Sequence, residues 1–372
     1  MQKLLPAITV AVVMTLLPMC GIVLVNGDLG PVLDFFPLPG CVVHAGFSWL
    51  VFVVMASIVV AVITPLAVKV ALSRTPPKLL PRNPYPRWWR GAVLLCLVSW
   101  ILAWTRFDWF ARVQPFTFFP LWLGYIGVVN GVTYRRSGRC MLTHRSGYLV
   151  GLFLFSALFW WFFEYLNRYV RNWYYTGVDG LSLIQYALFA TLSFTTVLPA
   201  VLSTYEMFVT FPGLSGGLDN YLKVDIRYPR VAAGGGVCIG CAGLLAIGIW
   251  PEYLYPLLWL SPLIIVTGIQ RLLGRATIFT PLKHGNWKRL FLLAISALFC
   301  GLFWEMWNSF SYAKWIYSIP LVQRFHIFEM PLLGYAGYLT FGLECGVAAD
   351  LLHLEKAPSP VPFDNSCRPP EL

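Results

Sequence analysis

The chain has 372 residues, of which 58% are hydrophobic and 12% charged, and its mean hydropathy is +0.69. A soluble globule of this length has too little interior to bury so much apolar surface, so the composition indicates an integral membrane protein. The net charge of +11 does not indicate nucleic acid binding, because the basic residues fall in short loops between apolar stretches.

Apolar stretches of about 17 to 25 residues predict an all-α, polytopic transmembrane helical bundle of about ten spans. We expect the spans at 4–25, 44–68, 91–105, 117–134, 147–163, 182–210, 232–250, 253–270, 290–305 and 330–353. The third and ninth are short, and only Pro251-Glu252 separates the seventh from the eighth, so eight or nine spans also fit. The first run has no small-x-small cleavage site, which favours a span over a signal peptide.

The distribution of Lys and Arg predicts the orientation. When successive loops alternate between the two sides, one side holds 21 of the 27 basic residues together with both termini. Basic loops are retained in the cytoplasm, so we expect a multi-pass protein of the bacterial inner membrane with cytoplasmic N and C termini. The six basic residues on the outer side are Arg106, Arg112, Arg168, Arg171, Lys314 and Arg324.

Ordered polar matches within the chain predict an internal duplication. Arg135-Arg136-Ser137-Gly138-Arg139 recurs as Arg271-Leu272-Leu273-Gly274-Arg275 at an offset of 136, and Ser156-Ala157-Leu158-Phe159 recurs as Ser296-Ala297-Leu298-Phe299 at 140. Two parallel four-span units would be related by an axis along the membrane normal. We expect a hairpin and basic loop at 1–89, repeats at 90–230 and 231–353, and a disordered cytoplasmic tail at 354–372.

The clearest polar constellation is Glu-x-x-Asn, which occurs as Glu164/Asn167 and again as Glu305/Asn308 at an offset of 141. Residues three apart share one helix face, and each pair falls at the outer end of its span. In one interpretation the two carboxyls and two amides converge between the repeats to bind a cation, a polar head group or a proton. In the other they cap and tether the helix ends.

Two further groups are candidates for chemistry. His326-x-x-Glu329 has a spacing that suits a metal ion or a proton relay, but a metal needs another ligand, so a hydrogen-bonded structural pair is favoured and no metal is predicted. Glu344 falls about 21 Å beyond Met330 on a helix, deep in the bilayer core. Its carboxyl must face the bundle interior, as a structural group or as part of a substrate or proton path.

The cysteine and glycine patterns do not indicate a chemical site. Cys238-Ile239-Gly240-Cys241 has redox or metal spacing, but it follows three glycines inside an apolar span and is typical of close helix packing. The nine cysteines are scattered through apolar segments, so no disulfide framework is expected. There is no phosphate-binding glycine loop or dinucleotide fingerprint, so we expect no cofactor.

The runs Phe118-Phe119-Pro120-Leu121-Trp122-Leu123-Gly124-Tyr125 and Phe328-Glu329-Met330-Pro331-Leu332-Leu333-Gly334-Tyr335 resemble segments of uncharacterised bacterial multi-pass inner-membrane proteins. That resemblance implies the location and no activity. More remotely, repeated helical units with Glu near span ends are similar to lycopene-cyclase-type membrane proteins, in which carboxyl groups protonate a polyene. The Glu-Glu pair of that pattern is missing, since Met330 follows Glu329, and the similarity implies only a bundle architecture.

These observations predict a membrane protein that binds or processes a lipid-like or amphiphilic molecule in a periplasm-facing cavity. Its polar lining is expected to comprise Glu164, Asn167, Glu305, Asn308, His326 and Glu329, with Glu344 deeper. A proton-coupled or small-solute transporter and a membrane-complex scaffold are the alternatives. The expected partners are membrane lipids and a lipid-like or small-molecule substrate, and the pattern leaves open whether the protein is an enzyme.

Overall fold

The computed structural model describes residues 4–29, 42–73 and 83–352, so the predicted tail at 354–372 and part of the basic loop lie outside the described residues. The described chain is a bundle of helices with two short two-stranded sheets. The longer helices are α1 (Leu4–Asn26), α3 (Trp49–Ala71), α4 (Arg87–Trp104), α5 (Phe118–Ser137), α7 (Ser146–Val170), α8 (Leu183–Phe194), α9 (Val197–Val209), α10 (Pro229–Ile249), α12 (Leu257–Leu272), α13 (Lys288–Phe310) and α14 (Tyr335–Leu352). The short elements used below are α11 (Pro251–Leu254), η3 (Pro212–Ser215), η4 (Thr280–His284), η5 (Leu332–Gly334), β1 (Trp173–Thr176), β2 (Lys314–Tyr317), β3 (His326–Ile327) and β4 (Met330–Pro331).

Within the described ranges, eight helical stretches are long and apolar enough to cross a membrane. They comprise α1, α3, α5, α7, α8 with α9, α10, α13 and α14, so the predicted all-α bundle with membrane-spanning helices is confirmed. The other two predicted spans fall on α4, whose 18 residues include two Arg and four Trp, and on α12, which has only 16 residues. The count of ten therefore stays a prediction.

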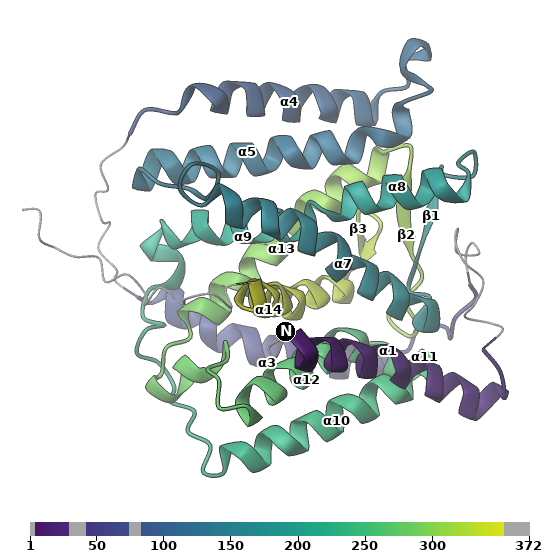
Figure 1. Ribbon diagram of the computed structural model, residues 1–372, viewed down its shortest axis with the longest axis vertical. Coiled ribbons are helices and arrows are strands. Elements are labelled where there is room, and N and C mark those ends of the chain that lie inside the picture. The colour runs from purple at the N-terminus through teal and green to yellow at the C-terminus, as the bar shows by residue number, and fades with distance from the viewer. Residues whose placement is uncertain (1–3, 30–41, 74–82, 353–372) are drawn as a thin grey trace, which may run out of the picture.

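The helices pack with α14 in the middle of the bundle (Figure 1). The pair α4 and α5 lies at one end, while α10 and α12 lie at the other with α1 against α10. Between them, α9 and α13 pack on each other and on α14. The main apolar core runs through these contacts and includes Trp122, Phe163, Leu258 and Phe341 among its buried side chains.

Small residues allow the closest helix contacts. A Cβ atom on Gly21 of α1 would overlap the carbonyl oxygen of Leu245 in α10, and one on Gly248 would overlap Pro18 of α1. Such backbone approach without intervening side chains is how helices associate where water exclusion gives no driving force. The small residues therefore bring α1 onto α10.

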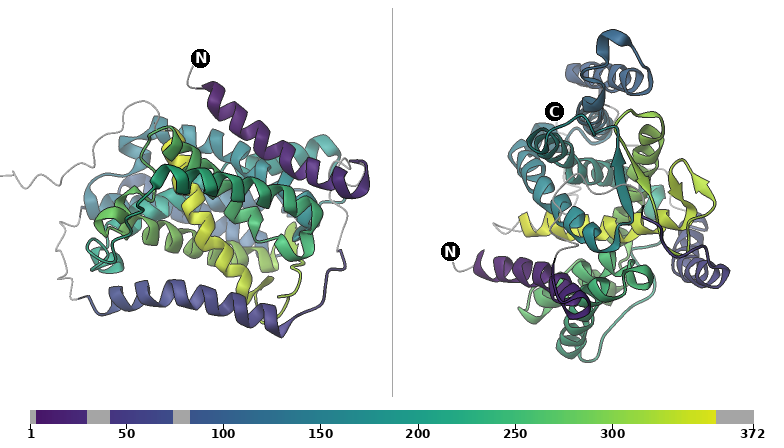
Figure 2. Two further views of the ribbon diagram at one scale, coloured as in Figure 1. Left: turned by 90° about the horizontal axis from the view of Figure 1, so that it is seen from below. Right: turned by 90° about the vertical axis from the view of Figure 1, so that its right-hand side faces the viewer.

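Helix α3 is the exception to this packing (Figure 2). It stands along one edge of the bundle, has no buried residue, and has its main backbone contacts with the short helices η3 and η5. Its sequence is apolar around the whole circumference, which is typical of a helix surrounded by lipid rather than one with a core-facing stripe. This loose attachment leaves room between α3 and the bundle.

The strands β1 and β2 pair antiparallel and join the end of α7 to the end of α13. Trp173 lies opposite Tyr317, and Tyr175 lies opposite Trp315. The strands were not predicted from the sequence. Helix α7 ends where Arg171 adopts a left-handed conformation with φ of 49°, which turns the chain out of the helix and into β1.

One predicted span consists of two helices in the structure rather than one. The stretch 182–210 contains two helices, α8 and α9, because the helix breaks at Thr195 and Thr196. The hydroxyl groups of both threonines donate to carbonyl oxygens three residues back, and the Oγ of Ser156 in α7 accepts from the backbone N–H of Leu198. These side-chain bonds replace the helical ones at the break.

Candidate functional site

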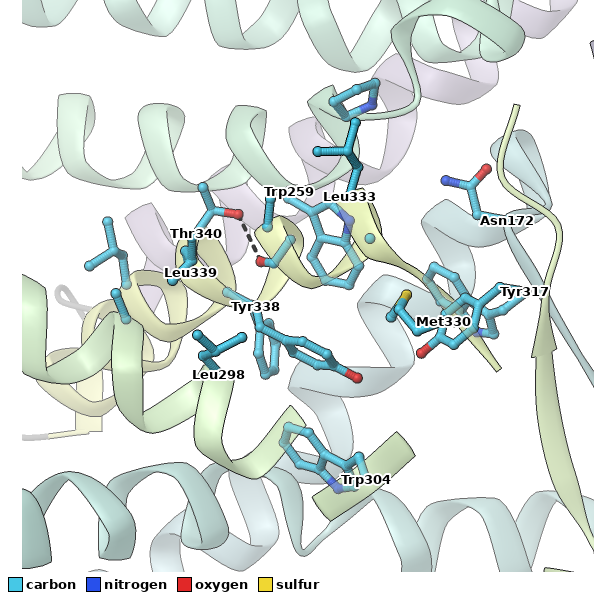
Figure 3. Close-up of a pocket in the computed structure, with 18 of the residues that line it drawn as sticks. Asn172, Trp259, Leu298, Trp304, Tyr317, Met330, Leu333, Tyr338, Leu339 and Thr340 are labelled. Atoms are coloured by element: carbon cyan, nitrogen blue, oxygen red, sulfur yellow. Dashed lines mark hydrogen bonds between the residues drawn. The ribbon is translucent and has the colours of Figure 1, made fainter. Parts of the chain in front are cut away.

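A cavity of about 890 Å³ lies between α3 and the bundle. Its walls come from α3, α8, α12, α13 and α14, from β1 and β2 at one end, and from η4 at the other. Figure 3 shows the middle of this space, where Trp259, Tyr338 and Trp304 lie around it and Met330 and Tyr317 lie toward the strands. The lining is dominated by aliphatic and aromatic side chains, so the cavity suits an apolar guest.

The one charged side chain of the described lining and several of its polar groups lie toward the strands. Asn172, Tyr175, Lys314, Tyr317 and Tyr338 line this end of the cavity. The opposite end is formed by Phe279, Leu282 and Trp287 with the aliphatic side chains of α13, and it is almost wholly apolar. The cavity is therefore amphipathic along its length.

The first Glu-x-x-Asn motif holds β1. Oε1 of Glu164 accepts hydrogen bonds from the indole N–H groups of Trp160 and Trp173 at 2.9 and 3.1 Å and from the hydroxyl of Tyr175 at 2.6 Å. The side chain of Asn167 donates to the carbonyl of Trp173 at 2.8 Å and accepts from the backbone N–H of Asn172 at 2.8 Å. Both residues are fully buried, so this motif fixes the strand and its rings.

The second motif holds β2 in the same way. Oε1 of Glu305 accepts from the indole of Trp315 at 3.4 Å and from the hydroxyl groups of Tyr317 and Tyr338 at 2.8 and 2.6 Å. Asn308 donates to the carbonyl of Trp315 at 2.7 Å and accepts from its N–H at 2.9 Å. Each Glu thus orients a Trp-x-Tyr pair, and each Asn binds the backbone of that Trp.

The two motifs face each other across the strand pair. Trp173 is opposite Tyr317 and Tyr175 is opposite Trp315, so the residues that bind one carboxyl lie opposite those that bind the other. Burial raises the pKa of the Tyr175 and Tyr317 phenols well above the usual value, and the neighbouring Glu164 or Glu305 carboxyl raises it further. Both phenols therefore stay protonated as hydrogen-bond donors.

The second oxygen of each carboxyl has no partner. Oε2 of Glu164 and Oε2 of Glu305 are buried without a hydrogen bond among the described residues, as is Oδ1 of Asn172. A buried, unsatisfied acceptor is costly. Neither carboxyl lines the cavity directly, and both interpretations of the motif, a binding group and a structural tether, stay predictions.

His326 and Glu329 do not form the predicted pair. The β3–β4 hairpin separates them, so they do not share a helix face. His326 is exposed, with its Nε2 at 3.2 Å from the side-chain nitrogen of Gln323, while Glu329 accepts from Nζ of Lys314 at 2.5 Å. Glu329 thus neutralises the one basic side chain among the residues that line the cavity.

Glu344 is buried in α14, with 4% of its surface exposed, and neither of its carboxyl oxygens has a hydrogen-bond partner in the described chain. Its neighbour Leu343 lines the cavity, but Glu344 itself does not. Glu344 thus lies inside the bundle and does not contact the cavity directly, and its depth in a bilayer stays a prediction.

The seven predicted site residues therefore do not make up the cavity surface. Glu164, Asn167, Glu305 and Asn308 lie behind the rings that form it, because each motif folds back onto the strand that follows its own helix. Sequence reasoning missed the rings themselves, which are Trp173, Tyr175, Trp315, Tyr317 and Tyr338. A signal was present, since Trp-x-Tyr follows both Glu-x-x-Asn motifs at an offset of 142.

In the described parts of the chain, no group of three or more His, Cys, Asp or Glu side chains is placed to hold a metal ion. Comparison with protein-family models, characterised proteins and solved structures finds no match for this chain. Function is therefore inferred from the cavity and the groups around it.

Proposed function

We propose that this is a multi-pass protein of the bacterial inner membrane that binds an amphiphilic, lipid-like molecule in the cavity beside α3. The observation that carries the proposal is the cavity itself, which holds about 890 Å³ and is lined mainly by apolar side chains. Binding sites for small molecules have roughly this size and character. A water-soluble metabolite would find few polar partners there.

The shape of the cavity supports an elongated guest. Its α3 wall runs from Met55 to Ala67, which corresponds to about 18 Å of helix. Several of the polar groups lie at the strand end, so the guest's head would lie near Asn172 and Lys314 with its apolar chain toward Phe279 and Trp287. Because Glu329 already pairs with Lys314, an uncharged head with hydrogen-bonding groups fits better than a strongly anionic one.

The loose packing of α3 supports entry from the bilayer. Val59 and Ile63 line the cavity, yet α3 has no buried residue and its main backbone contacts are with two short helices. Parting α3 from the bundle would therefore break few contacts. An apolar molecule would then reach the cavity sideways without crossing water.

The duplication is part of the same proposal. Glu164 and Glu305 each bind a Trp and a Tyr two residues apart, and Asn167 and Asn308 each bind the backbone of that Trp. The strand register supports a two-fold relation, because pairing Trp173 with Tyr317 is equivalent to pairing Trp315 with Tyr175. Two parallel four-helix units at 90–230 and 231–353 would place the cavity's polar end on their shared strand pair.

The orientation rests on charge. The side with 21 of the 27 Lys and Arg is assigned to the cytoplasm, which places β1 and β2 on the periplasmic side. The cavity's polar end would then lie near the periplasmic surface.

A matched pair of substitutions tests the binding proposal. Val59 lines the cavity, whereas Val60 is 59% exposed and does not line it. We expect Val59→Trp to abolish retention of an amphiphile seen by native mass spectrometry after gentle extraction, because the indole fills the cavity. Val60→Trp should retain it. Equal retention by both folded variants, or a water-soluble solute or protein partner in place of the amphiphile, would contradict the proposal.

A further inference from the structure

A second, basic cavity of about 350 Å³ lies at the other end of the bundle from α4 and α5, where α10 begins and α12 ends. Arg227 lies just before α10, Arg230 lies in its first turn, and Arg271 comes from the last turn of α12. The lining is completed by Tyr228, Pro229, Val231 and Gly274. Three arginines thus line a space large enough for a phosphate and its substituents.

The charge of this cavity is not balanced within its lining, which contains no acidic residue. Two acidic residues of the preceding segment face other cations: Asp219 pairs with Lys288 at 3.1 Å, and Asp225 pairs with Lys283 at 3.8 Å. Guanidinium groups bind phosphate oxygens through two parallel hydrogen bonds. An anion between the three arginines would relieve their mutual repulsion.

The start of α10 adds to this positive field. Pro229 occupies its first turn, and Tyr228 at the N-cap makes no side-chain capping bond. The first N–H groups of a helix have no partner within the helix, and they point outward at the positive end of the helix dipole. Here the helix start and the arginines act on the same space.

Apolar surface adjoins the basic cavity. Val231 lines it and is 74% exposed, and Ile239 two turns further along α10 is 69% exposed. Exposed aliphatic side chains along a helix of this hydropathy are suited to lipid chains. We propose that this cavity binds the phosphate of an anionic phospholipid, whose acyl chains lie along α10. This inference rests on the membrane placement proposed above, but not on the cavity beside α3.

The test compares two triple variants with the same change in charge. In the first, Arg227, Arg230 and Arg271 are replaced by Gln. In the control, Arg87, Arg90 and Arg139 are replaced by Gln, since these exposed arginines lie at the start of α4 and just after α5. Native mass spectrometry in detergent measures the affinity for added phosphatidylglycerol, with phosphatidylcholine and inorganic phosphate as separate probes.

We expect the first triple variant to lose phosphatidylglycerol affinity by about a hundredfold, which corresponds to about fivefold for each arginine. The control triple variant should bind as the parent does, and Arg271→Gln alone gives the fivefold effect if the first triple variant does not fold. Equal binding by the two triple variants would overturn the proposal. So would displacement of the lipid by millimolar inorganic phosphate, which would indicate a site for the free anion.

Failure here is distinguishable from failure of the proposed function. Val59→Trp lies on α3, away from the basic cavity, and should leave phosphatidylglycerol binding unchanged. The triple arginine variant should likewise retain the amphiphile in the cavity beside α3.

Discussion

Replacing either motif asparagine with alanine is expected to destabilise the fold strongly. Ser318 donates its N–H to the carbonyl of Asn172, and antiparallel ladder bonds alternate, so the backbone N–H and C=O of Trp173 point away from β2. Asn167 bonds to both of these groups and also accepts from the N–H of Asn172. The Asn167 side chain thus makes the hydrogen bonds that a third strand would otherwise make with Trp173.

Asn167→Ala leaves up to three backbone groups without a partner in a buried setting. Each costs about 1–3 kcal/mol, so three such groups give an expected loss in the free energy of unfolding of about 3–9 kcal/mol. Asn308→Ala removes the two bonds to Trp315 and should cost about 2–6 kcal/mol for the same reason. We therefore expect Asn167→Ala and Asn308→Ala to lower the free energy of unfolding by similar amounts.

Equilibrium unfolding in mixed detergent micelles measures both losses. Asn286→Ala is the control, because Oδ1 of Asn286 accepts one bond, from the N–H of Lys288 at the start of α13, and its removal should cost about 1 kcal/mol. If Asn167→Ala and Asn308→Ala unfold within about 0.5 kcal/mol of the parent, the two asparagines do not hold the strands and the reasoning fails.

Three further outcomes are expected. A Cβ on Gly342 would overlap the carbonyl oxygen of Leu293, so Gly342→Ala should lower the midpoint of thermal unfolding. Gly147→Ala is the control, because a Cβ there has no neighbouring atom within 4 Å and should leave the midpoint unchanged. Equal midpoints for the two variants would contradict this prediction. The folded-state pKa of Tyr175 and Tyr317 is raised, so their neutral phenols stabilise the fold below about pH 10 and this stability is lost as the pH rises further. Tyr175→Phe and Tyr317→Phe should therefore each remove, from the phenolate absorbance of the parent, one tyrosine that ionises only on unfolding, and titration of either phenol in the folded protein would refute it. Glu344 does not line the cavity, so Glu344→Gln should keep the amphiphile in native mass spectrometry; its loss would favour a role for Glu344 in the site.

The spans were predictable because long apolar runs dominate the sequence. The ends of the helices were less predictable. The predicted spans 147–163 and 290–305 stop short of α7 and α13, which continue to Val170 and Phe310. The turns beyond those ends carry Glu164, Asn167 and Asn308, and Glu305 is the last residue of its predicted span; the polarity of these residues resembles that of a loop. These four side chains form hydrogen bonds with β1 and β2, so the protein itself supplies their hydrogen-bond partners.

The site was only partly predictable for a related reason. The repeated Glu-x-x-Asn spacing drew attention to both motifs, but pattern alone does not show what a buried carboxyl contacts. The partners of the two carboxyls are indole and phenol groups, which the Glu-x-x-Asn pattern does not indicate. His326 and Glu329 were paired from their spacing alone, whereas the chain forms a hairpin at that point.

The absence of buried residues on α3 has a consequence for how this protein would respond to its surroundings. A molecule admitted past α3 never dissolves in the aqueous phase, so occupancy depends on its mole fraction among the lipids and not on its concentration in the cell. Dilution of the membrane with inert phospholipid would then empty the cavity at constant total amphiphile.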